Sequence, residues 1–223
     1  RYNPHYSVAL TEPVMITLFE QFSDTISCRF LSRDDDRTPT ENSVRLHQVH
    51  GNKTIVTHDK MNATKQADGV LTDTPKLDLI IRAADCQNFA IFVPEKNIIG
   101  VLHSGWKGLL ASAIPEFLHA AEQEWGTKSS DIFVAAGPSL CASCAEFSNP
   151  AIELPGIDQK FFNGRLVDLQ GFADQQLFAS GILPEHFERS PDCTLCKNDV
   201  YLSYRGTDKD DVKAGLSNFL VCS

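Results

Sequence analysis

Three residues with metal-binding or nucleophilic side chains each come at the end of an apolar, strand-like run. His50 ends the stretch RLHQVH, Cys86 follows LDLIIRAAD, and His103 ends IIGVLH. Residues at strand ends can converge on one edge of a sheet, where two imidazoles and a thiolate would supply three zinc ligands and leave a fourth position open for water or substrate. Spacing alone leaves this convergence open, because a lone histidine at a strand end is more often a hydrogen-bonded structural residue.

The same side chains would also suit a different chemistry. A thiol hydrolase or deamidase needs a cysteine with a low thiol pKa and a nearby imidazole, so Cys86 as nucleophile and His103 as base would suffice. The metal content of the protein separates the two hypotheses. Zinc that is lost when His50 is changed would indicate a metalloenzyme, whereas alkylation of metal-free Cys86 at neutral pH would indicate the thiol mechanism.

The most visible cysteine pattern is a different one, two Cys-x-x-Cys pairs of the kind that closes a tetrahedral zinc site. The first pair is Cys141 and Cys144, and the second is Cys193 and Cys196. The interval between the pairs far exceeds the ~15 to 20 residues usual in a zinc ribbon, so the spacing favours small buried thiols over a zinc site. The seven cysteines of the chain form an odd set, which favours free thiols or metal ligands over a disulfide framework.

The elements that position these residues are mainly strands in the first half of the chain. Runs rich in β-branched and aromatic residues predict strands over residues 14–19, 25–31, 44–49, 54–57, 77–82, 89–93, 98–102 and 132–135. After Gly105, apolar residues at helical spacing predict a helix that Pro115 should kink or break. A second helix is expected over residues 168–180, with Gly181 as its stop signal, and a last strand over residues 216–221.

Strands joined by short connections, followed by helices, favour an α+β fold in which helices flank a mixed β-sheet core. The chain contains no internal repeat, low-complexity tract or linker, and we therefore expect residues 1–223 to form a single domain. Hydrophobic residues make up 42% of the chain and aromatic residues 9%, which suffices for a substantial core.

The charge and the lack of long apolar stretches limit the classes of partner. A formal net charge of -9 and a sequence pI near 5.2 argue against a general nucleic-acid binder, which needs clustered Lys and Arg. No apolar stretch approaches the ~18 residues of a membrane helix, and the first residues lack a signal-peptide pattern. We therefore expect a cytoplasmic protein with neither nucleic-acid nor membrane partners. The sequence carries no indication of an oligomeric state.

Five stretches of the chain carry specific motifs. They are LHQVHGNKTIV, ADGVLTD, LDLIIRAADCQNFAIFVPEKNIIGVLHSGWKGLLAS, AAGPSLCASCAEF and CTLCKNDVYLSYRG. Together they cover most of residues 44–206, and the elements Q-V-H-G, D-C and H-x-G-W-[RK]-G in this order are quite specific. The stretches resemble, in order, the motif blocks of the laccase-domain family, whose members are also called polyphenol oxidase-like proteins and purine nucleoside phosphorylases.

The resemblance implies the laccase-domain fold and a zinc ion bound by the histidine of Q-V-H-G, the cysteine of A-D-C and the histidine before the G-W pair. In this chain these residues are His50, Cys86 and His103, the set at the strand ends. It also implies that Gly105 and Gly108 let the backbone approach the substrate closely. Members of the family are associated with phosphorolysis of adenosine, inosine and methylthioadenosine, with deamination of adenosine, and in some cases with peptidoglycan precursor editing.

On this resemblance we expect a zinc-dependent purine nucleoside phosphorylase, with a further adenosine deaminase activity, that acts on small purine nucleosides and phosphate. A zinc-activated water could attack C6 of adenine, with Asp85 or Gln48 as candidates to manage protons. Phosphorolysis requires cationic groups that hold phosphate while the glycosidic bond loosens, and Lys107 and Arg205 are the candidates. A solvated residue of a first helical turn and a surface ion pair are the structural alternatives for these two cations.

Two features depart from the pattern of the family. The family commonly opens with a T-T-R-x-G-G-V-S block, whereas TISCRFLSRDDDRTPTENS lacks its glycines. Lys107 stands where arginine is usual and lacks the bidentate fork of a guanidinium. These departures affect substrate binding more than metal binding, so a metal-containing binding or peptidoglycan-editing protein with weakened catalysis is an alternative. Phosphate-dependent release of adenine or hypoxanthine would argue against this alternative.

Copper is less favoured than zinc as the metal. Two histidines and a cysteine are also the equatorial ligands of a blue-copper site. A multicopper oxidase, however, needs a trinuclear cluster with paired H-x-H motifs, and none of the seven histidines belongs to such a motif. We therefore do not expect true laccase activity.

Overall fold

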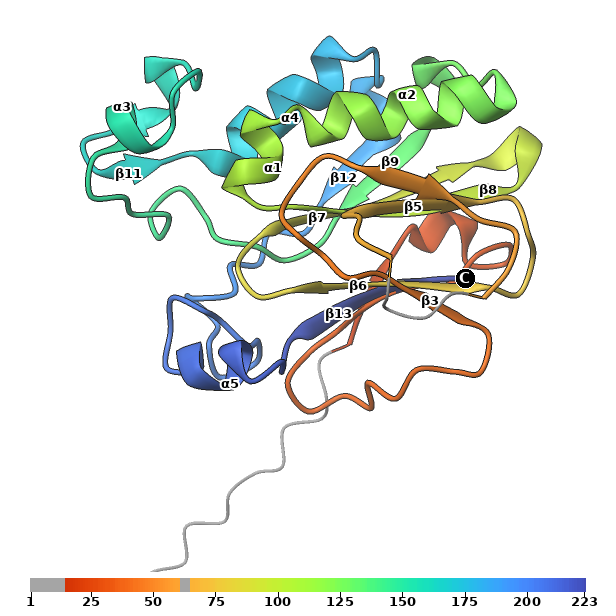
Figure 1. The fold of residues 1–223 in the computed structure, drawn as a ribbon, viewed down its shortest axis with the longest axis horizontal. Coiled ribbons are helices and arrows are strands. Elements are labelled where there is room, and N and C mark those ends of the chain that lie inside the picture. Colours follow the sequence, from red (N-terminus) through yellow and green to blue (C-terminus); the bar gives the residue numbers. More distant parts are fainter. Residues whose placement is uncertain (1–14, 61–64) are drawn as a thin grey trace, which may run out of the picture.

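Two β-sheets lie face to face, and helices cover the outer face of one of them (Figure 1). The structure is a computed structural model and describes residues 15–60 and 65–223. The start of the first predicted strand at Val14 and the N-terminal stretch without a signal-peptide pattern lie outside these residues. Within them, none of the helices combines the length and the apolar character needed to cross a bilayer.

The strands form a six-stranded sheet, a five-stranded sheet and a small hairpin. The six-stranded sheet has the order β12 (Phe187–Arg189), β9 (Phe133–Ala136), β7 (Gln87–Val93), β8 (Ile98–Ser104), β5 (Gly69–Thr72) and β4 (Thr54–Val56). The five-stranded sheet has the order β1 (Ile16–Leu18), β2 (Cys28–Leu31), β13 (Asn218–Cys222), β6 (Asp78–Ala83) and β3 (Ser43–Arg45). The hairpin pairs β10 (Phe162–Asn163) with β11 (Leu166–Val167).

Both large sheets mix parallel and antiparallel pairs, which confirms the predicted α+β fold. β12 runs parallel to β9, β4 to β5 and β3 to β6, while the central pair β7 and β8 is antiparallel. Because the carboxyl ends of parallel strands leave a sheet at the same edge, the segments that come after β9 and β12 start side by side.

Strand β7 is buried on both faces and joins the two hydrophobic cores. Phe89 and Ile91 pack into the core between the sheet and the helices, whereas Ala90 and Phe92 pack into the core between the two sheets. Because successive side chains of a strand point to opposite faces, a strand between two apolar layers needs a continuous hydrophobic run. This explains the run NFAIFV in the sequence.

Helices α2 and α4 lie along the outer face of the six-stranded sheet, with α1 beside them (Figure 1). The α-helices are α1 (Trp106–Leu110), α2 (Ala113–Trp125), α3 (Pro150–Glu153), α4 (Leu169–Ala179) and α5 (Lys209–Lys213). Short 3-10 helices occur at Glu20–Phe22, Pro94–Lys96, Ser129–Asp131, Gln159–Phe161 and Pro184–His186.

The expected break in the helix after Gly105 occurs, but not at Pro115. The chain turns at Ser112, whose φ of 59° is left-handed, and α2 begins at Ala113. Pro115 therefore lies in the first turn of α2, where its missing N–H leaves no helical hydrogen bond unmade.

Every predicted strand overlaps an observed one, but two differences matter for the site. The run predicted over residues 44–49 forms a strand only as far as Arg45, so His50 lies in a loop and not at a strand end. The pattern does not predict β5, because its run GVLT is short and is enclosed by two aspartates. The helix predicted over residues 168–180 is confirmed as α4, and Asp168 caps it.

Candidate metal centre and cavity

The structure brings His50, Cys86 and His103 together. One ligand atom from each residue lies within 4.8 Å of the other two. Cys86 stands in the turn between β6 and β7, and His103 stands in β8, where the antiparallel register pairs it with Asn88. The start of β7 and the end of β8 thus meet at one edge of the six-stranded sheet. His50 reaches this edge from the loop between β3 and β4, and its ring centroid lies 4.8 Å from that of His103.

The buried carboxylate of Asp68 holds both histidines in place. It accepts the backbone N–H groups of Val49 at 3.2 Å, His50 at 3.0 Å and Gly51 at 2.8 Å. Burial raises the pKa of Asp68, but the hydrogen bond with His103 and these backbone bonds outweigh burial and lower it. The ionised carboxylate therefore accepts the Nδ1–H of His103 at 2.8 Å. This bond leaves Nε2 of His103 as the nitrogen available to a metal.

Cys86 and His103 stabilise each other's charged forms. Burial raises the pKa of the Cys86 thiol, but the positive charge and hydrogen bond of His103 outweigh burial and lower it to about 6. Burial lowers the pKa of His103, but the Cys86 thiolate and the Asp68 carboxylate outweigh burial and raise it to about 9. These shifts favour a thiolate beside an imidazolium at neutral pH, and a metal that binds Nε2 of His103 would displace the proton there. A thiolate is the form in which cysteine binds metals and attacks as a nucleophile.

Glycine at position 105 permits the close approach of two of the three ligands. A Cβ at Gly105 would lie 2.9 Å from Sγ of Cys86 and 3.2 Å from Cδ2 of His50. Gly108 plays a different part, because a Cβ there would lie 3.1 Å from the carbonyl oxygen of Gly51, and Gly108 does not line the cavity. The expectation that both glycines approach the substrate is therefore corrected for Gly108, which packs α1 against the loop of His50.

A cavity of about 600 Å³ lies beside the three ligands, all of which line it. Small-molecule sites typically measure ~300 to 1,000 Å³. Trp106, Phe147 and Tyr204 give the cavity flat apolar walls. Helices α1 and α5, which contribute to the lining, lie at the same end of the two sheets in Figure 1. The cavity is therefore large enough for a nucleoside, and aromatic residues form part of its lining.

Positive charge gathers around this cavity although the chain as a whole is acidic. Arg82, Arg205 and Lys213 line it. Among the described residues that line it, Asp85 is the only acid. With a formal net charge of -9 for the chain, this local excess of cations favours an anionic group in the cavity.

The carboxylate of Asp85 faces protein groups on both oxygens. Oδ1 accepts the hydroxyls of Thr194 and Ser203, each at 2.7 Å, and Oδ2 accepts the N–H of Arg205 at 2.7 Å. Burial raises the pKa of Asp85 above its usual value, in spite of these bonds. Asp85 also has a left-handed φ of 87°, just before Cys86. It thus ties the turn that carries Cys86 to the segment that carries Arg205.

The structure separates the two cations expected to hold phosphate. Arg205 lines the cavity, and its guanidinium carbon lies 5.3 Å from the centroid of the Phe147 ring. Lys107 is exposed and is not among the described residues that line the cavity. Its ammonium lies 5.4 Å from the centroid of the ring of Trp106, which does line the cavity. The position of Lys107 therefore corresponds to the solvated alternative.

Gln48 lines the cavity, but its amide is engaged with the backbone. It donates to the carbonyl oxygen of Arg82 and accepts the N–H of Arg82, both at 2.8 Å. The sequence reasoning missed Asp68, Arg82 and Lys213. A signal existed for Asp68, because an acidic residue between the buried residues of an ADGVLTD block must be satisfied by hydrogen bonds. No local pattern distinguishes the two cations from other exposed Lys and Arg residues.

The segment that lacks the family's glycines, residues 25–43, contributes none of the described residues that line the cavity. Arg33 of this segment pairs with Asp208 at 2.7 Å, and Arg37 donates to the carbonyl oxygen of Ser217 at 2.6 Å. Ser217 does line the cavity. The divergent segment therefore contacts the cavity wall at Ser217 from outside.

All seven cysteines are free, and four of them gather away from the three ligands. The sulfurs of Cys141, Cys144, Cys193 and Cys196 all lie within 4.8 Å of one another. The spacing favours small buried thiols, but of these four only Cys193 is buried, so the expected burial is wrong for the other three. Cys196 is exposed, and the two pairs meet in spite of the long interval between them.

Comparison with known proteins agrees with the motif blocks. Residues 29–217 match the family model described as multi-copper polyphenol oxidoreductase laccase. Purine nucleoside phosphorylase YlmD of Bacillus subtilis (strain 168) is 25% identical over 211 residues, which are 86% of this chain and 75% of the relative. Purine nucleoside phosphorylase ORF3 of Streptomyces griseus is 30% identical over 171 residues, which are 73% of this chain and 68% of the relative.

A solved structure confirms the fold. The crystal structure of the hypothetical protein YfiH of Bacillus licheniformis matches with a TM-score of 0.79 at 19% identity, covering 96% of this chain and 97% of that chain.

Proposed function

The chain belongs to the multi-copper polyphenol oxidoreductase laccase family, and from this premise we propose that it is a zinc-dependent purine nucleoside phosphorylase. The relatives named purine nucleoside phosphorylase support an enzyme of this kind. One observation carries the proposal: His50, Cys86 and His103 meet at a cavity that also presents cations and aromatic rings. Phosphorolysis of a nucleoside requires a pocket for the flat base and cationic groups for phosphate, and a metal at the same cavity can supply Lewis-acid activation.

The three ligands fit zinc. Two imidazoles and one thiolate form a three-ligand set of the kind that catalytic zinc takes, with one position left open. The charge and hydrogen bond of His103 lower the pKa of Cys86 to about 6, which favours the thiolate that a metal binds, and Asp68 orients His103 through Nδ1. A zinc ion held by these residues would supply Lewis-acid activation at the open position. Although the family name refers to copper, we favour zinc because no H-x-H pair for a trinuclear copper cluster exists in the sequence.

In this proposal the aromatic walls bind the purine. Trp106, Phe147 and Tyr204 offer flat faces for stacking, which is tolerant of the substituent at C6. We therefore expect adenosine, inosine and methylthioadenosine all to enter the cavity.

The cations bind phosphate. Arg82, Arg205 and Lys213 place positive charge around the cavity. In phosphorolysis a phosphate oxygen bonds to C1′ of the sugar while the bond from C1′ to the purine nitrogen breaks, and the base leaves with the electron pair of that bond and takes up a proton. Fixed cations hold the anionic nucleophile in place for this displacement. We leave Lys107 out of the phosphate site because it is exposed outside the cavity.

We also propose adenosine deamination as a further activity of the same centre. Asp85 and Gln48 serve here as positioning residues, because the carboxylate of one and the amide of the other already hold protein groups. Release of ammonia and inosine from adenosine in phosphate-free buffer tests this activity separately from phosphorolysis.

The decisive assay incubates the purified chain with adenosine, inosine or methylthioadenosine, with and without phosphate, and measures the free base. We expect base release only with phosphate, loss of activity after chelation, and recovery when zinc is returned. If protein that retains its zinc releases no base under any of these conditions, the proposal is wrong, and a binding or peptidoglycan-editing role is favoured.

A thiol hydrolase or deamidase is the second candidate, because Cys86 is held as a thiolate beside His103. Iodoacetamide distinguishes the two mechanisms. A bound metal should protect Cys86 from alkylation, and the phosphorylase activity should then survive treatment of the zinc-loaded protein. Amide hydrolysis by metal-free protein that alkylation abolishes would instead support the thiol mechanism.

A further inference from the structure

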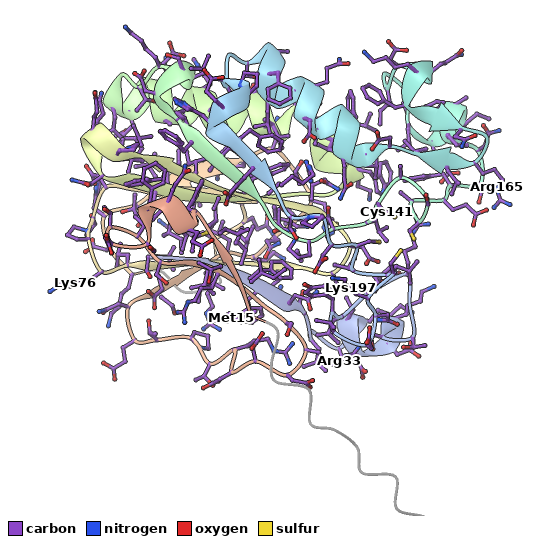
Figure 2. The ribbon with its side chains drawn as sticks, turned by 180° about the vertical axis from the view of Figure 1, so that it is seen from behind. Met15, Arg33, Lys76, Cys141, Arg165 and Lys197 are labelled. Carbon is purple, nitrogen blue, oxygen red and sulfur yellow. The ribbon has the colours of Figure 1, made fainter. Side chains whose placement is uncertain are left out.

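The four clustered cysteines lie in two turns that follow neighbouring parallel strands. The turn with Cys141 and Cys144 comes after β9, and the turn with Cys193 and Cys196 comes after β12. Because β9 and β12 are parallel, both turns leave the sheet at the same edge. An additional bridge between Ser139 and Cys193 continues the pairing beyond the strands. Figure 2 shows Cys141 and Lys197, the neighbour of Cys196, at the same end of the molecule.

The distances between the sulfurs match a single tetrahedral ion. Sγ of Cys196 lies 3.5 Å from Sγ of Cys144 and 4.0 Å from Sγ of Cys141. Four sulfurs at ~2.3 Å from a zinc ion in tetrahedral geometry are about 3.8 Å apart. Sγ of Cys193 accepts the N–H of Cys141 at 3.3 Å, a bond that stabilises a thiolate.

Other ways to use four cysteines fit these distances less well. A disulfide needs a bond of ~2.05 Å and pairs sulfurs two by two, whereas here Cys196 is close to both Cys141 and Cys144. An iron–sulfur cluster spreads its cysteine ligands around several metal and sulfide ions, which separates them more widely. A mononuclear site remains, and tetrahedral coordination by four sulfurs is typical of zinc.

We propose that Cys141, Cys144, Cys193 and Cys196 bind a zinc ion in a closed tetrathiolate site. Four protein ligands fill the coordination shell of the ion, so the site is structural and has no position for a substrate. Exposed Cys196 gives the metal a path of entry. The site is independent of the phosphorylase function proposed above.

The two turns also contact the wall of the cavity. Leu140, next to Cys141, lines the cavity, and its N–H donates to the carbonyl oxygen of Asp85 at 3.0 Å. Thr194, next to Cys193, donates its hydroxyl to the carboxylate of Asp85 at 2.7 Å. A zinc ion that joins the turns therefore fixes Asp85 from two sides, and Asp85 precedes a ligand of the other metal centre.

Elemental analysis of the full chain tests the site. The double variant Cys144→Ser/Cys196→Ser should contain one zinc ion fewer per chain than the wild type. The control Cys222→Ala, a buried cysteine of β13 outside both ligand groups, should keep the wild-type zinc content. In a His103→Ala background the same double change should lower the zinc content from one ion per chain to zero. The result then depends neither on zinc at His50, Cys86 and His103 nor on enzyme activity.

A second measurement covers the case in which the double variant fails to fold. Wild-type protein reconstituted with Co²⁺ should show two kinds of sulfur-to-cobalt charge-transfer absorption, with the stronger one persisting in His103→Ala, because four thiolates contribute instead of one. Unchanged zinc content in the double variant, iron in place of zinc, or disulfides between these cysteines in peptides mapped without reduction would each overturn the proposal.

Discussion

The two groups of side chains that we propose as metal ligands are assembled in different ways. His50, Cys86 and His103 come from three separate segments, and the carboxylate of Asp68 holds the two histidines. The four cysteines come from two short turns at the ends of a parallel strand pair and need no side chain from elsewhere. Three ligands beside a cavity leave room for chemistry, whereas four ligands close the coordination shell.

The comparison teaches that the position of each group relative to the cavity, and not its number of cysteines, distinguishes a catalytic metal site from a structural one. Among the described residues next to the four cysteines, Leu140 lines the cavity, and Thr194 reaches its wall through a hydrogen bond to Asp85. The group with the histidines lines the cavity itself. Changes in the first group should therefore act mainly on stability, and changes in the second mainly on turnover.

The largest effect is expected from His103→Ala. This change removes one of three ligands, and loss of Lewis-acid activation worth several kcal/mol should lower kcat/KM for phosphorolysis roughly 10³-fold or more. Zinc content and kcat/KM are measured together, and the cysteine-bound zinc should remain. His119→Ala, an exposed histidine of α2, is the control and should match the wild type. Full activity of metal-free His103→Ala would refute the assignment.

The double change Cys144→Ser/Cys196→Ser should act on stability instead. Losing a structural metal costs about 4 kcal/mol, and each kcal/mol shifts the Tm of a chain of this size by roughly 2–4 °C, so Tm should fall by roughly 8–16 °C. Calorimetry in the His103→Ala background isolates this effect. Chelator should lower Tm in that background, and should have no further effect once both cysteines are changed. If chelator lowered Tm equally with and without the two cysteines, the cysteine group would not stabilise the protein through a bound metal, and the proposed difference between the two groups would be wrong.

Asp68→Asn should lower the metal affinity of His50, Cys86 and His103 without changing that of the four cysteines. An amide keeps the shape of the side chain but loses the charge that orients His103, and loss of such a partner typically lowers metal affinity or activity ~10- to 100-fold. Competition with a fluorescent zinc chelator measures the affinity of each site. Wild-type affinity at the open group in Asp68→Asn would mean that the histidines are held without this carboxylate.

The smallest predicted effect distinguishes two cations at the cavity. Arg205→Ala should raise KM for phosphate ~10-fold with a smaller change in kcat, because it removes binding of the anion. Lys107→Ala should change KM for phosphate less than about twofold, because Lys107 lies outside the cavity. Initial rates at varied phosphate measure both. If the two changes raised KM for phosphate equally, Lys107 would have to be counted among the residues that bind phosphate.

Local sequence pattern carries information about Cys86 and His103 because His103 lies in β8 and Cys86 lies in the short turn between β6 and β7. His50 is different, since β3 ends at Arg45 and the later loop is shaped by the contacts of Asp68. No periodicity reveals a carboxylate that turns back on a loop to accept three backbone N–H groups. The motif block ADGVLTD, and not the pattern of apolar residues, is where that information resides.

The cysteine pairs show the same limit on a larger scale. The interval between Cys144 and Cys193 contains two α-helices, two 3-10 helices, the hairpin and strand β12, so counting residues suggests separation. The pairing of β9 with β12 brings the pairs together, and a parallel pairing is a property of the folded sheet. Lys107 is a third case, because the side from which it leaves α1 depends on how that short helix is placed.

The burial of the central hairpin on both faces has a consequence for the order in which the open centre forms. Backbone amides of β7 and β8 should exchange with deuterium only when the whole molecule unfolds, so Cys86 and His103 are attached to the part that opens last. His50 is attached to a loop held by hydrogen bonds. A metal ion should therefore bind to Cys86 and His103 in positions that the folded sheet already fixes, and only His50 should have to move into place. We expect metal binding to be fast and not to require refolding of the protein.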